Sequence, residues 1–250
     1  MIDILSLETY CNELLSVDDF DDYCPNGLQV EATEQVTRLM VGVTACQALI
    51  KEAEHWGADA LLVHHGYFWR GERLPLRGLK GKRIGALFQQ HTSLLAYHLP
   101  LDAHPVYGNN RQLGNRLGFA GAKASPAGQS LIWQMRLPQP LSAGDLAQRL
   151  TDSLGRKPLH IGSNPGLLKR IGWCTGAAQG AIEEASALGL DAFISGEISE
   201  PTVHLARELG IHYFAAGHHA TERYGVQALG RHLAERFDLE YRFVDIENPV

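Results

Sequence analysis

The stretch VGVTACQALIKEAEHWGADALLVHHG, residues 41–66, contains the pattern that decides the fold. A short apolar segment is followed by an amphipathic segment of helical length, a glycine, and a second apolar segment that ends in His64 and His65. This order predicts a strand, a helix that stops at Gly57, and a second strand parallel to the first. The alternation continues, with helices expected over 81–92 and 141–155 and extended segments over 93–104 and 130–138. Strands that alternate with helices in this way indicate an α/β protein.

A second stretch, IGWCTGAAQGAIEEASALGLDAFISGE at residues 171–197, repeats this pattern. Its Glu-Ala, Gly and Asp-Ala positions recur at an offset of 132 residues. Chance similarity is common between such units, because each needs a helix, a glycine stop and an apolar strand. The shared Gly-x-Asp-Ala nevertheless favours an internal duplication, and we therefore expect two similar α/β lobes.

The boundary between these lobes is expected at the Gly/Ala/Ser/Pro-rich connector near residues 120–129. We therefore predict a first lobe over residues 1–125 and a second over 126–250. The tail from about residue 220 to 250 either stays in the second lobe or returns to the first, since its histidine and glutamate must reach ligands in the first.

The composition is that of a soluble globular protein, with 45% hydrophobic and 20% charged residues. The net charge of -6 makes nucleic acid an unlikely partner, because nucleic-acid-binding surfaces normally show a basic excess. No apolar run is long enough for a membrane span, and the acidic N-terminal segment does not resemble a signal peptide. The four cysteines are scattered and form no C-x-x-C pair, which favours free thiols and a cytoplasmic location.

Imidazole and carboxylate groups gather after three apolar segments of the chain. His64-His65 ends one segment, YHLPLDAH at 97–104 follows another, and AGHHATE at 216–222 follows the third. A single histidine is at least as often a hydrogen-bonded core residue as a ligand, but three such groups favour a metal site. Imidazole nitrogen and carboxylate oxygen suit Zn, Mn, Fe, Co and Ni alike, so the metal identity stays open.

The spacing of these residues favours two metal ions over one. His218 and Glu222 are four apart, so a helix beginning there presents both on one face. Asp102 follows Pro100 on a segment that we expect to be extended. His64 and His65 face opposite ways in a strand, so both join one cluster only if the strand ends there or if they bind different ions. Gly66 makes a turn at that point easy.

Five motifs together resemble one known family. PNGLQV, LLVHHG, YHLPLDAH, ISGE and AGHHATE occur in the order found in the GTP cyclohydrolase 1 type 2 homologues, also called the Nif-three-like family, in its short bacterial form. The resemblance covers nearly the whole chain. It implies two α/β lobes with a dinuclear metal site between them, and a toroidal homohexamer. The metal ligands that it implies, with Glu222 as the bridge, are His64, His65, Asp102, His218 and Glu222.

Two further residues are candidates for a role beside the metals. His98 lies four residues before Asp102 and is a candidate general acid or hydrogen-bond partner in the site. Glu197 ends the repeated strand, where it either orients a ligand, contacts substrate or only begins a helix. The PNGLQV segment is most simply a turn, and the family resemblance offers Asn26 and Gln29 as alternative substrate contacts.

Two functions remain open from the sequence. The first is a dinuclear-metal-dependent hydrolase acting on a nucleotide-like or heterocyclic substrate, as in a GTP cyclohydrolase. The second is a non-catalytic metal-binding ring that buffers or delivers metal, or serves as a scaffold. The basic run over 69–83 is either a solvated surface or a means of attracting an anionic substrate. A fold and its ligand set do not fix the substrate.

Overall fold

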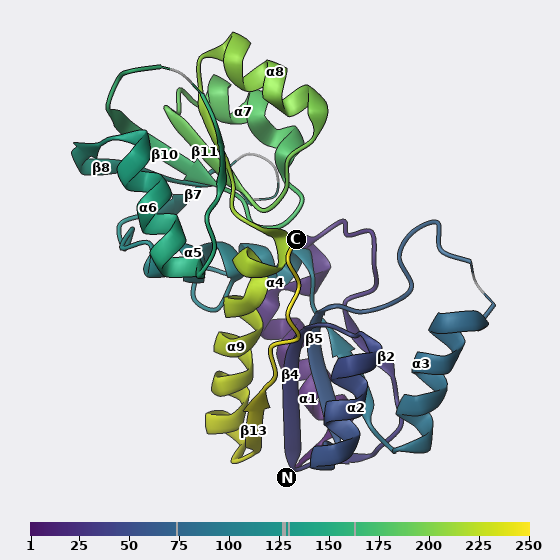
Figure 1. Cartoon of the computed structure of the whole chain (residues 1–250). Coiled ribbons are helices and arrows are strands. Elements are labelled where there is room, and N and C mark those ends of the chain that lie inside the picture. The colour runs from purple at the N-terminus through teal and green to yellow at the C-terminus, as the bar shows by residue number, and fades with distance from the viewer. Residues whose placement is uncertain (74, 127–128, 130, 163) are drawn as a thin grey trace. The chain divides into compact units, whose positions relative to one another are not determined.

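The computed structural model describes residues 1–73, 75–126, 129, 131–162 and 164–250 (Figure 1). Its contacts divide the chain into two compact units. Unit 1 comprises Met1–Gly108 and Gly225–Glu247, and unit 2 comprises Asn109–Tyr224 and Asn248–Val250. The connector on which the expected division at 125/126 was based lies in unit 2, and its residues 127 and 128 are outside the described part.

Unit 1 is built on a mixed sheet with the strand order β13-β4-β5-β6-β2. The first four of these strands are parallel, and β2 pairs antiparallel with β6 at the edge. A separate antiparallel pair joins β1 to β3. Among the described residues the strands of unit 1 are β1 (Ile2–Asp3), β2 (Gly27–Val30), β3 (Gln35–Val36), β4 (Arg38–Thr44), β5 (Ala60–His65), β6 (Ser93–Ala96) and β13 (Glu240–Phe243).

Helices cover both faces of this sheet. The apolar sides of α1 and α9 pack with Leu39, Val41 and Leu62 on one face, and those of α2 and α3 pack with Met40 and Leu61 on the other. Alternate residues of β4 therefore serve opposite layers, as the pleat of a strand requires. The helices of unit 1 are α1 (Ile4–Leu15), η1 (Val17–Asp19), α2 (Gln47–Trp56), α3 (Gly78–Gln89), α4 (Leu99–Ala103) and, from Gly225 onward, α9 (His218–Phe237).

Unit 2 has a mixed sheet with the strand order β7-β8-β10-β11-β12-β9. The central strands β10, β11 and β12 are parallel, while β8 and β9 pair antiparallel on either side of them. The described elements of unit 2 are α5 (Asn109–Arg116), β7 (Lys123–Ala124), β8 (Trp133–Leu141), α6 (Ala143–Leu154), β9 (Leu159–Ile161), β10 (Leu168–Trp173), η3 (Gln179–Ala181), α7 (Ile182–Ala187), β11 (Ala192–Ser195), α8 (Glu200–Leu209), β12 (His212–Ala215) and the first turns of α9.

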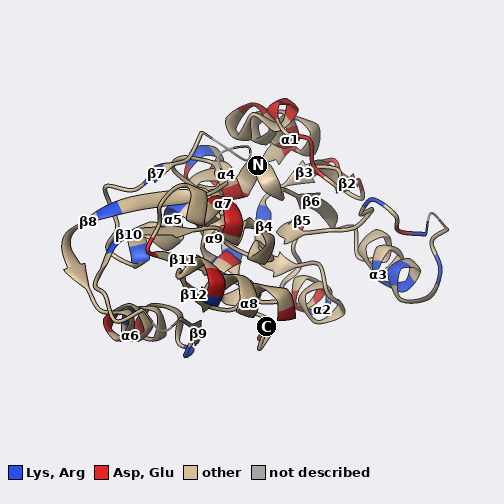
Figure 2. Cartoon of the chain, turned by 90° about the horizontal axis from the view of Figure 1, so that it is seen from above, with Lys and Arg blue, Asp and Glu red and all other residues tan. Residues whose placement is uncertain are grey.

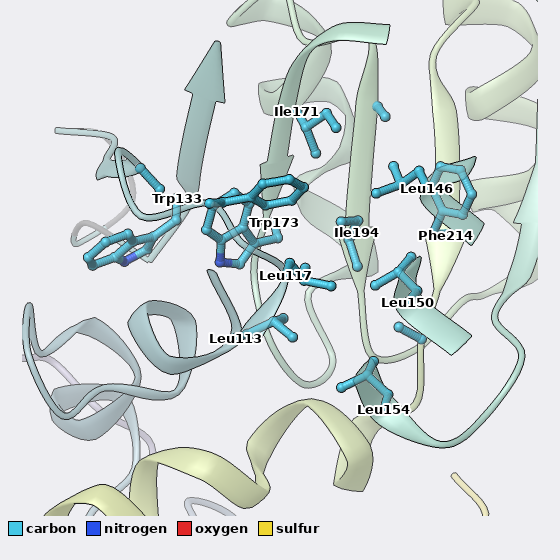
Figure 3. Close-up of a cluster of buried hydrophobic side chains, with 14 of the residues drawn as sticks. Leu113, Leu117, Trp133, Leu146, Leu150, Leu154, Ile171, Trp173, Ile194 and Phe214 are labelled. Carbon is cyan, nitrogen blue, oxygen red and sulfur yellow. The ribbon is translucent and has the colours of Figure 1, made fainter. Parts of the chain in front are cut away.

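The core of unit 2 also has two apolar layers. Figure 3 shows one of them, in which Trp173 lies among side chains of α5, α6 and the sheet. Its indole donates to the carbonyl oxygen of Asn110 at 2.8 Å, so its polar atom is satisfied inside the core. The opposite layer joins α7 and α8 to Phe193 and Tyr213. Each large side chain fully buried in this way contributes about 1.5–3 kcal/mol of transfer free energy.

The parallel strands of the two units begin with the same local arrangement. The carboxylate of Asp59 accepts hydrogen bonds from the backbone N–H groups of Thr37 and Arg38, both at 2.8 Å. The carboxylate of Asp191 accepts from those of Lys169 and Arg170, at 2.7 and 2.8 Å. In unit 1 the carboxylate just before β5 thus bonds to the start of β4, and in unit 2 the carboxylate just before β11 bonds to the start of β10.

The segment 93–104 departs from the extended conformation expected for it. The strand β6 ends at Ala96, and Leu99–Ala103 forms the short helix α4. Pro100 lies in the first turn of α4, where its fixed φ suits a helix and its missing N–H is not needed. The prediction of an extended Asp102 is therefore wrong, and the aspartate is presented from a helical turn.

None of the helices in the described residues combines the length and the apolar character that a membrane crossing requires.

Candidate metal centre

The end of β5 carries a buried imidazole whose tautomer is fixed. His64 Nδ1 lies 2.8 Å from the carbonyl oxygen of Tyr97, the residue that follows β6. A carbonyl oxygen can only accept, so Nδ1 carries the proton and donates it. The Nε2 atom lies 3.5 Å from Oδ1 of Asp102.

The contact between His64 and Asp102 has the dimensions of two ligands on one cation. Hydrogen bonds between nitrogen and oxygen are about 2.7–3.2 Å long, and this separation is longer. Metal bonds of about 2.1 Å at a tetrahedral angle place the nitrogen and oxygen about 3.4 Å apart. Both side chains are buried, with exposed fractions of 0% for His64 and 6% for Asp102. Two buried groups of this kind are stabilised by a positive charge between them, which either a proton or a bound cation can supply.

His65 joins the same group, although it is the adjacent residue in the chain. It is the last residue of β5, and its ring centroid lies 4.6 Å from that of His64. Its Nδ1 atom is 3.1 Å from the hydroxyl of Thr44, the residue paired with it across β4 and β5. One ring nitrogen from each of His64, His65 and His98 lies within 4.8 Å of the others. These three imidazoles and Asp102 form what we call the unit 1 cluster.

A second group of ligand-type side chains lies in unit 2. Helix α9 begins at His218, so His218 and Glu222 share one face of its first turn, as their spacing predicted. His218 Nε2 lies 3.0 Å from Oε2 of Glu222, and its Nδ1 lies 2.7 Å from Oε1 of Glu197. Glu197 follows β11. These three residues form what we call the unit 2 cluster.

The unit 2 cluster places one imidazole between two carboxylates. Burial lowers the pKa of His218, but hydrogen bonds and charge from Glu222 and Glu197 outweigh it and raise the pKa to about 9. The protein therefore favours a positive charge beside Glu222, which is only 2% exposed. A proton on Nε2 supplies that charge in the absence of metal, and a divalent cation bound between the same two atoms would supply it instead.

A glycine leaves room for this cluster. Gly176, with φ +69°, follows β10, and a side chain there would collide with the carboxylate of Glu222 and approach His218 Nε2 to 3.3 Å. Gly196, which corresponds to His64 in the internal repeat, would meet the backbone of His218 at 2.6 Å. Both glycines allow the start of α9 to lie close to the ends of β10 and β11.

Gly66 has a different role from the one expected. Its φ is not in the left-handed region, and a side chain there would collide with Gln29 and lie 2.7 Å from Cβ of Ala96. The Gln29 amide accepts from Tyr67 N at 2.7 Å and donates to Tyr67 O at 3.1 Å. Gln29 thus holds the backbone that follows the histidine pair.

His98 is held by residues of the N-terminal loop. Its Nδ1 lies 2.9 Å from Oδ1 of Asp22, and its backbone N–H donates to Oδ1 of Asn26 at 2.7 Å. Asn26 also donates to the other oxygen of Asp22 at 2.9 Å. Asn26 and Gln29 are therefore both occupied by contacts within the protein, which supports a structural role for PNGLQV.

The sequence reasoning overlooked Asp22, Thr44, Tyr97 and Gly176. Asp22 and His98 are 76 residues apart, and the contact of Tyr97 is made by a backbone oxygen, which no side-chain motif can reveal. The glycine at 176 carried a weak signal, since it follows an apolar strand of the internal repeat.

The basic segment 69–83 forms a loop and the start of α3, where the ribbon of Figure 2 is coloured blue at several Lys and Arg positions. A pocket of about 440 Å³ lies here, lined by Glu72, Arg73, Pro75, Arg77, Gly78 and Lys80. Lys80 is bonded to Glu72 at 3.2 Å and to the carbonyl oxygen of Arg73 at 2.8 Å. Residue 74 lies outside the described residues. The pocket is therefore cationic but partly neutralised by Glu72.

The chain is a mixed α/β protein that matches the Duf34/NIF3 (NGG1p interacting factor 3) family over residues 2–249, and it belongs to that family. The resemblance inferred from the motifs is thus confirmed. A relative from Allochromatium vinosum, named GTP cyclohydrolase 1 type 2 homolog, is 53% identical over 250 residues, covering 100% of this chain and 98% of the relative. A relative of the same name from Escherichia coli K12 is 48% identical over 245 residues, covering 98% of each.

Solved structures agree along the full chain. The protein ybgI, described as of unknown function, is 47% identical with a TM-score of 0.94, and each chain is covered completely. TTHA1606 from Thermus thermophilus is 32% identical with a TM-score of 0.90, again over 100% of both chains.

Proposed function

We propose that the chain is a dinuclear-metal-dependent hydrolase acting on an anionic, nucleotide-like or heterocyclic substrate. In this proposal the unit 1 and unit 2 clusters are the two parts of one centre between the lobes. Five residues would hold the two divalent ions, with Glu222 as the bridging ligand: His64, His65, Asp102, His218 and Glu222. The observation that carries the proposal is the 3.5 Å separation between His64 Nε2 and Oδ1 of Asp102, both of them buried.

The unit 2 cluster alone offers too few ligands for a tightly held ion. Structural zinc sites use four protein ligands, and catalytic ones use about three with a water. The unit 2 cluster supplies only His218 Nε2 and the Glu222 carboxylate, because Glu197 uses its carboxylate to hold His218 Nδ1. A carboxylate that holds the far nitrogen of a ligating histidine is a usual partner in metal sites. Joining the clusters would give both ions enough protein ligands.

Two divalent ions would lower the pKa of a bound water and polarise an electrophilic centre. Residues of the chain would transfer protons, orient a ligand and attract the substrate. Asp22 and Asn26 hold His98 beside His64 and His65, where it would transfer protons. Glu197 fixes the ring of His218. Arg73, Arg77 and Lys80 would attract an anionic substrate, for which GTP is the named candidate from the family resemblance.

The second candidate is a non-catalytic metal-binding ring that buffers, delivers or scaffolds. The raised pKa of His218 favours this candidate, because a proton and a metal ion would compete for the same ring nitrogen. Bound metal would then be released as pH falls. The identity of the metal stays open among Zn, Mn, Fe, Co and Ni.

We further propose that the two lobes arose by internal duplication. The matching carboxylate contacts of Asp59 and Asp191 support this, as do the glycines with left-handed backbone at 57 and 189.

We also propose a toroidal homohexamer in the cytoplasm, neither a membrane protein nor a nucleic-acid-binding one. The thiols of Cys11, Cys24, Cys46 and Cys174 are free, as a reducing compartment would keep them. Sedimentation of the purified protein tests the assembly.

The first experiment is metal analysis of purified Glu222→Gln beside the wild type. Glu200→Gln is the matched control, because Glu200 pairs with His204 at 3.0 Å, also four residues apart, on the exposed face of α8. We expect about two ions per chain in the wild type and the control, and about one or none in Glu222→Gln. About one ion or none in the wild type would contradict the dinuclear centre.

The second experiment is turnover of GTP and a panel of nucleotides by the metal-loaded proteins. The hydrolase proposal expects a rate for the wild type and Glu200→Gln that exceeds that of Glu222→Gln by at least about 100-fold. Equal background rates in all three, with two ions bound to the wild type, would support the non-catalytic alternative.

A further inference from the structure

Asp22 is a buried carboxylate whose two oxygens are both fully engaged. Its Oδ1 accepts from the backbone N–H of Tyr23 at 2.7 Å and from His98 Nδ1 at 2.9 Å. Its Oδ2 accepts from the side chain of Asn26 and the backbone N–H of Leu99, both at 2.9 Å. The side chain is 4% exposed. With the Cys24 thiol, which donates to Oδ1 at 3.9 Å, five donors converge on one carboxylate, so the structure specifies its position and its charge.

These donors keep Asp22 ionised. Burial raises the pKa of Asp22, but the hydrogen bond and charge of His98, followed by the donors from Asn26 and Leu99, outweigh it and lower the pKa to about 2. An ionised carboxylate only accepts, so the Nδ1 atom of His98 must carry the proton that joins them. Nε2 is then the nitrogen that this pairing leaves for another partner.

The surroundings of His98 orient this second nitrogen. The ring packs edge-on against Tyr23 and Trp69, with centroids 5.2 and 5.0 Å away. On another side lie the rings of His64 and His65, with centroids at 5.0 and 5.9 Å. The aromatic contacts and the bond to Asp22 leave the ring little freedom to flip.

A metal site at Asp22, Cys24 and His98 is the obvious alternative, because ligand-type atoms of these three lie within 4.8 Å of one another. The hydrogen bonds argue against it. Oδ2 of Asp22 already accepts from two donors, and Oδ1 accepts from three, among them His98 Nδ1 and the Cys24 thiol itself. Burial, and then the charge of Asp22, raise the pKa of Cys24 to about 12, so its sulfur is a neutral thiol and a poor ligand.

We infer that Asp22 is a positioning residue that holds His98 as the Nδ1–H tautomer and presents Nε2 toward His64 and His65 as a proton acceptor. This deepens the proposed function and rests on it for the reaction, but the tautomer itself does not depend on turnover. In the reaction, Nε2 takes a proton from the attacking water and returns it to the leaving group, so the imidazole ends each cycle unchanged. Asp22 stabilises the imidazolium formed between these steps and stays ionised.

Asp22→Asn tests the inference because an amide cannot replace this carboxylate in either orientation. If the NH₂ group faces His98, it opposes the backbone N–H of Tyr23, and Nδ1 must accept, so the ring proton moves to Nε2. If it faces Asn26 and Leu99, it opposes the backbone N–H of Leu99. Asn26 cannot compensate by flipping, since its oxygen already accepts from the backbone N–H of His98.

The direct measurement is neutron diffraction from hydrogen–deuterium-exchanged crystals of metal-free and zinc-loaded full-length protein. We expect deuterium on Nδ1 of His98 in the wild type and on Nε2 in Asp22→Asn. Asp59→Asn is the matched control, since the Asp59 carboxylate also accepts backbone donors in unit 1, from Thr37 and Arg38 rather than from an imidazole. It should leave the proton of His98 on Nδ1. A wild-type proton on Nε2 would overturn the inference, and so would a proton on Nδ1 in an Asp22→Asn structure whose amide nitrogen faces His98.

Kinetics give an independent test if turnover exists. Asp22→Asn should lower kcat by about 10²-fold or more with KM changed by less than about twofold, while Asp59→Asn keeps kcat. His98→Asn retains a donor for Asp22 and removes Nε2, and in that background Asp22→Asn should cost nothing further. If the double variant lost kcat by the product of the two single fold-changes, Asp22 would not act through His98. Absence of turnover in the wild type would refute the hydrolase proposal and leave the neutron result as the test of the tautomer.

Discussion

The Nε2 atom of His64 and the Oδ1 atom of Asp102 face each other 3.5 Å apart, while the only proton that His64 needs for its Tyr97 contact is on Nδ1. This relationship predicts opposite effects of Asp102→Asn with and without metal. In the metal-free protein the new amide can donate to Nε2, so the free energy of unfolding stays equal or rises by about 0.5–1.5 kcal/mol. With zinc, the stabilisation by bound metal, about 2.7 kcal/mol at 100 times Kd, shrinks or disappears.

Thermal unfolding with and without zinc measures both effects of Asp102→Asn. Asp191→Asn is a useful comparison, since it removes a carboxylate that accepts two backbone donors. This variant should lose the same amount of stability with zinc as without it. A loss from Asp102→Asn that is independent of zinc would refute a ligand role for Asp102.

Thr44→Val removes the hydroxyl that lies 3.1 Å from His65 Nδ1 while keeping the shape of the side chain. The ring of His65 then loses the contact that sets its orientation, so we expect zinc affinity to fall by about 10–100-fold. Competition with a chelator of known affinity measures this. Thr9→Val, which removes an exposed hydroxyl bonded to Leu5 O at 2.8 Å, should leave the affinity unchanged. Equal affinities for all three proteins would show that Thr44 does not orient the ligand.

Gly176→Ala should destabilise unit 2 for two reasons that a control separates. Gly176 and Gly210 have nearly the same backbone, with φ +69° and +68°, but a side chain at 210 would meet nothing within 4 Å. Gly210→Ala therefore reports the backbone cost alone, about 1–2 kcal/mol. Gly176→Ala adds a collision with Glu222, so its cost should exceed that of Gly210→Ala by about 1–3 kcal/mol, and it should also lower zinc binding. Chemical denaturation and metal titration check both parts. Equal costs at the two positions would mean that α9 moves aside.

The stability of the protein should fall with pH below about 6.5 because of a histidine pair in unit 2. His160 Nε2 donates to His212 Nδ1, and His212 Nε2 donates to Asn164 O, each at 2.9 Å. Burial, and then the charge of His212, lower the pKa of His160 below its ordinary value of 6.5. The folded state thus favours neutral His160, so its contribution is fully present above the unfolded pKa and is lost as pH falls toward the folded pKa.

Melting temperatures of the metal-free protein between pH 8 and pH 5 test this dependence. His160→Gln keeps an N–H donor that does not titrate, so we expect a smaller drop in melting temperature than in the wild type. His204→Gln, at an exposed histidine, should keep the wild-type drop. An unchanged drop in His160→Gln would place the pH dependence elsewhere.

The sequence predicted those parts of the structure that depend on local pattern. The strands and helices of residues 41–66 follow their hydrophobic periodicity, and His218 and Glu222 share a helical face because their spacing fits one turn. The helix α4 was missed because PLDA is short and follows a strand, and five residues carry too little periodicity to be recognised.

The contacts that support the ligands were beyond sequence reasoning for a different reason. Asp22 meets His98 across 76 residues, and its acidic surroundings in DDFDDYC resemble a solvated loop. The partner of His64 is a backbone carbonyl, which every residue possesses. Only the fold reveals which of many acceptors lies opposite a given imidazole.

The return of residues Gly225–Glu247 to unit 1 has a consequence for biosynthesis. Strand β13 pairs with β4, and α9 covers one face of the sheet with Val226, Leu229 and Leu233. A ribosome delivers these residues after Asn109–Tyr224, so residues 1–108 wait with an open sheet edge and an uncovered apolar face. The segment Asn109–Tyr224, continuous in the chain, can collapse during that wait. Unit 1 thus completes its sheet only after nearly the whole of unit 2 has been synthesised.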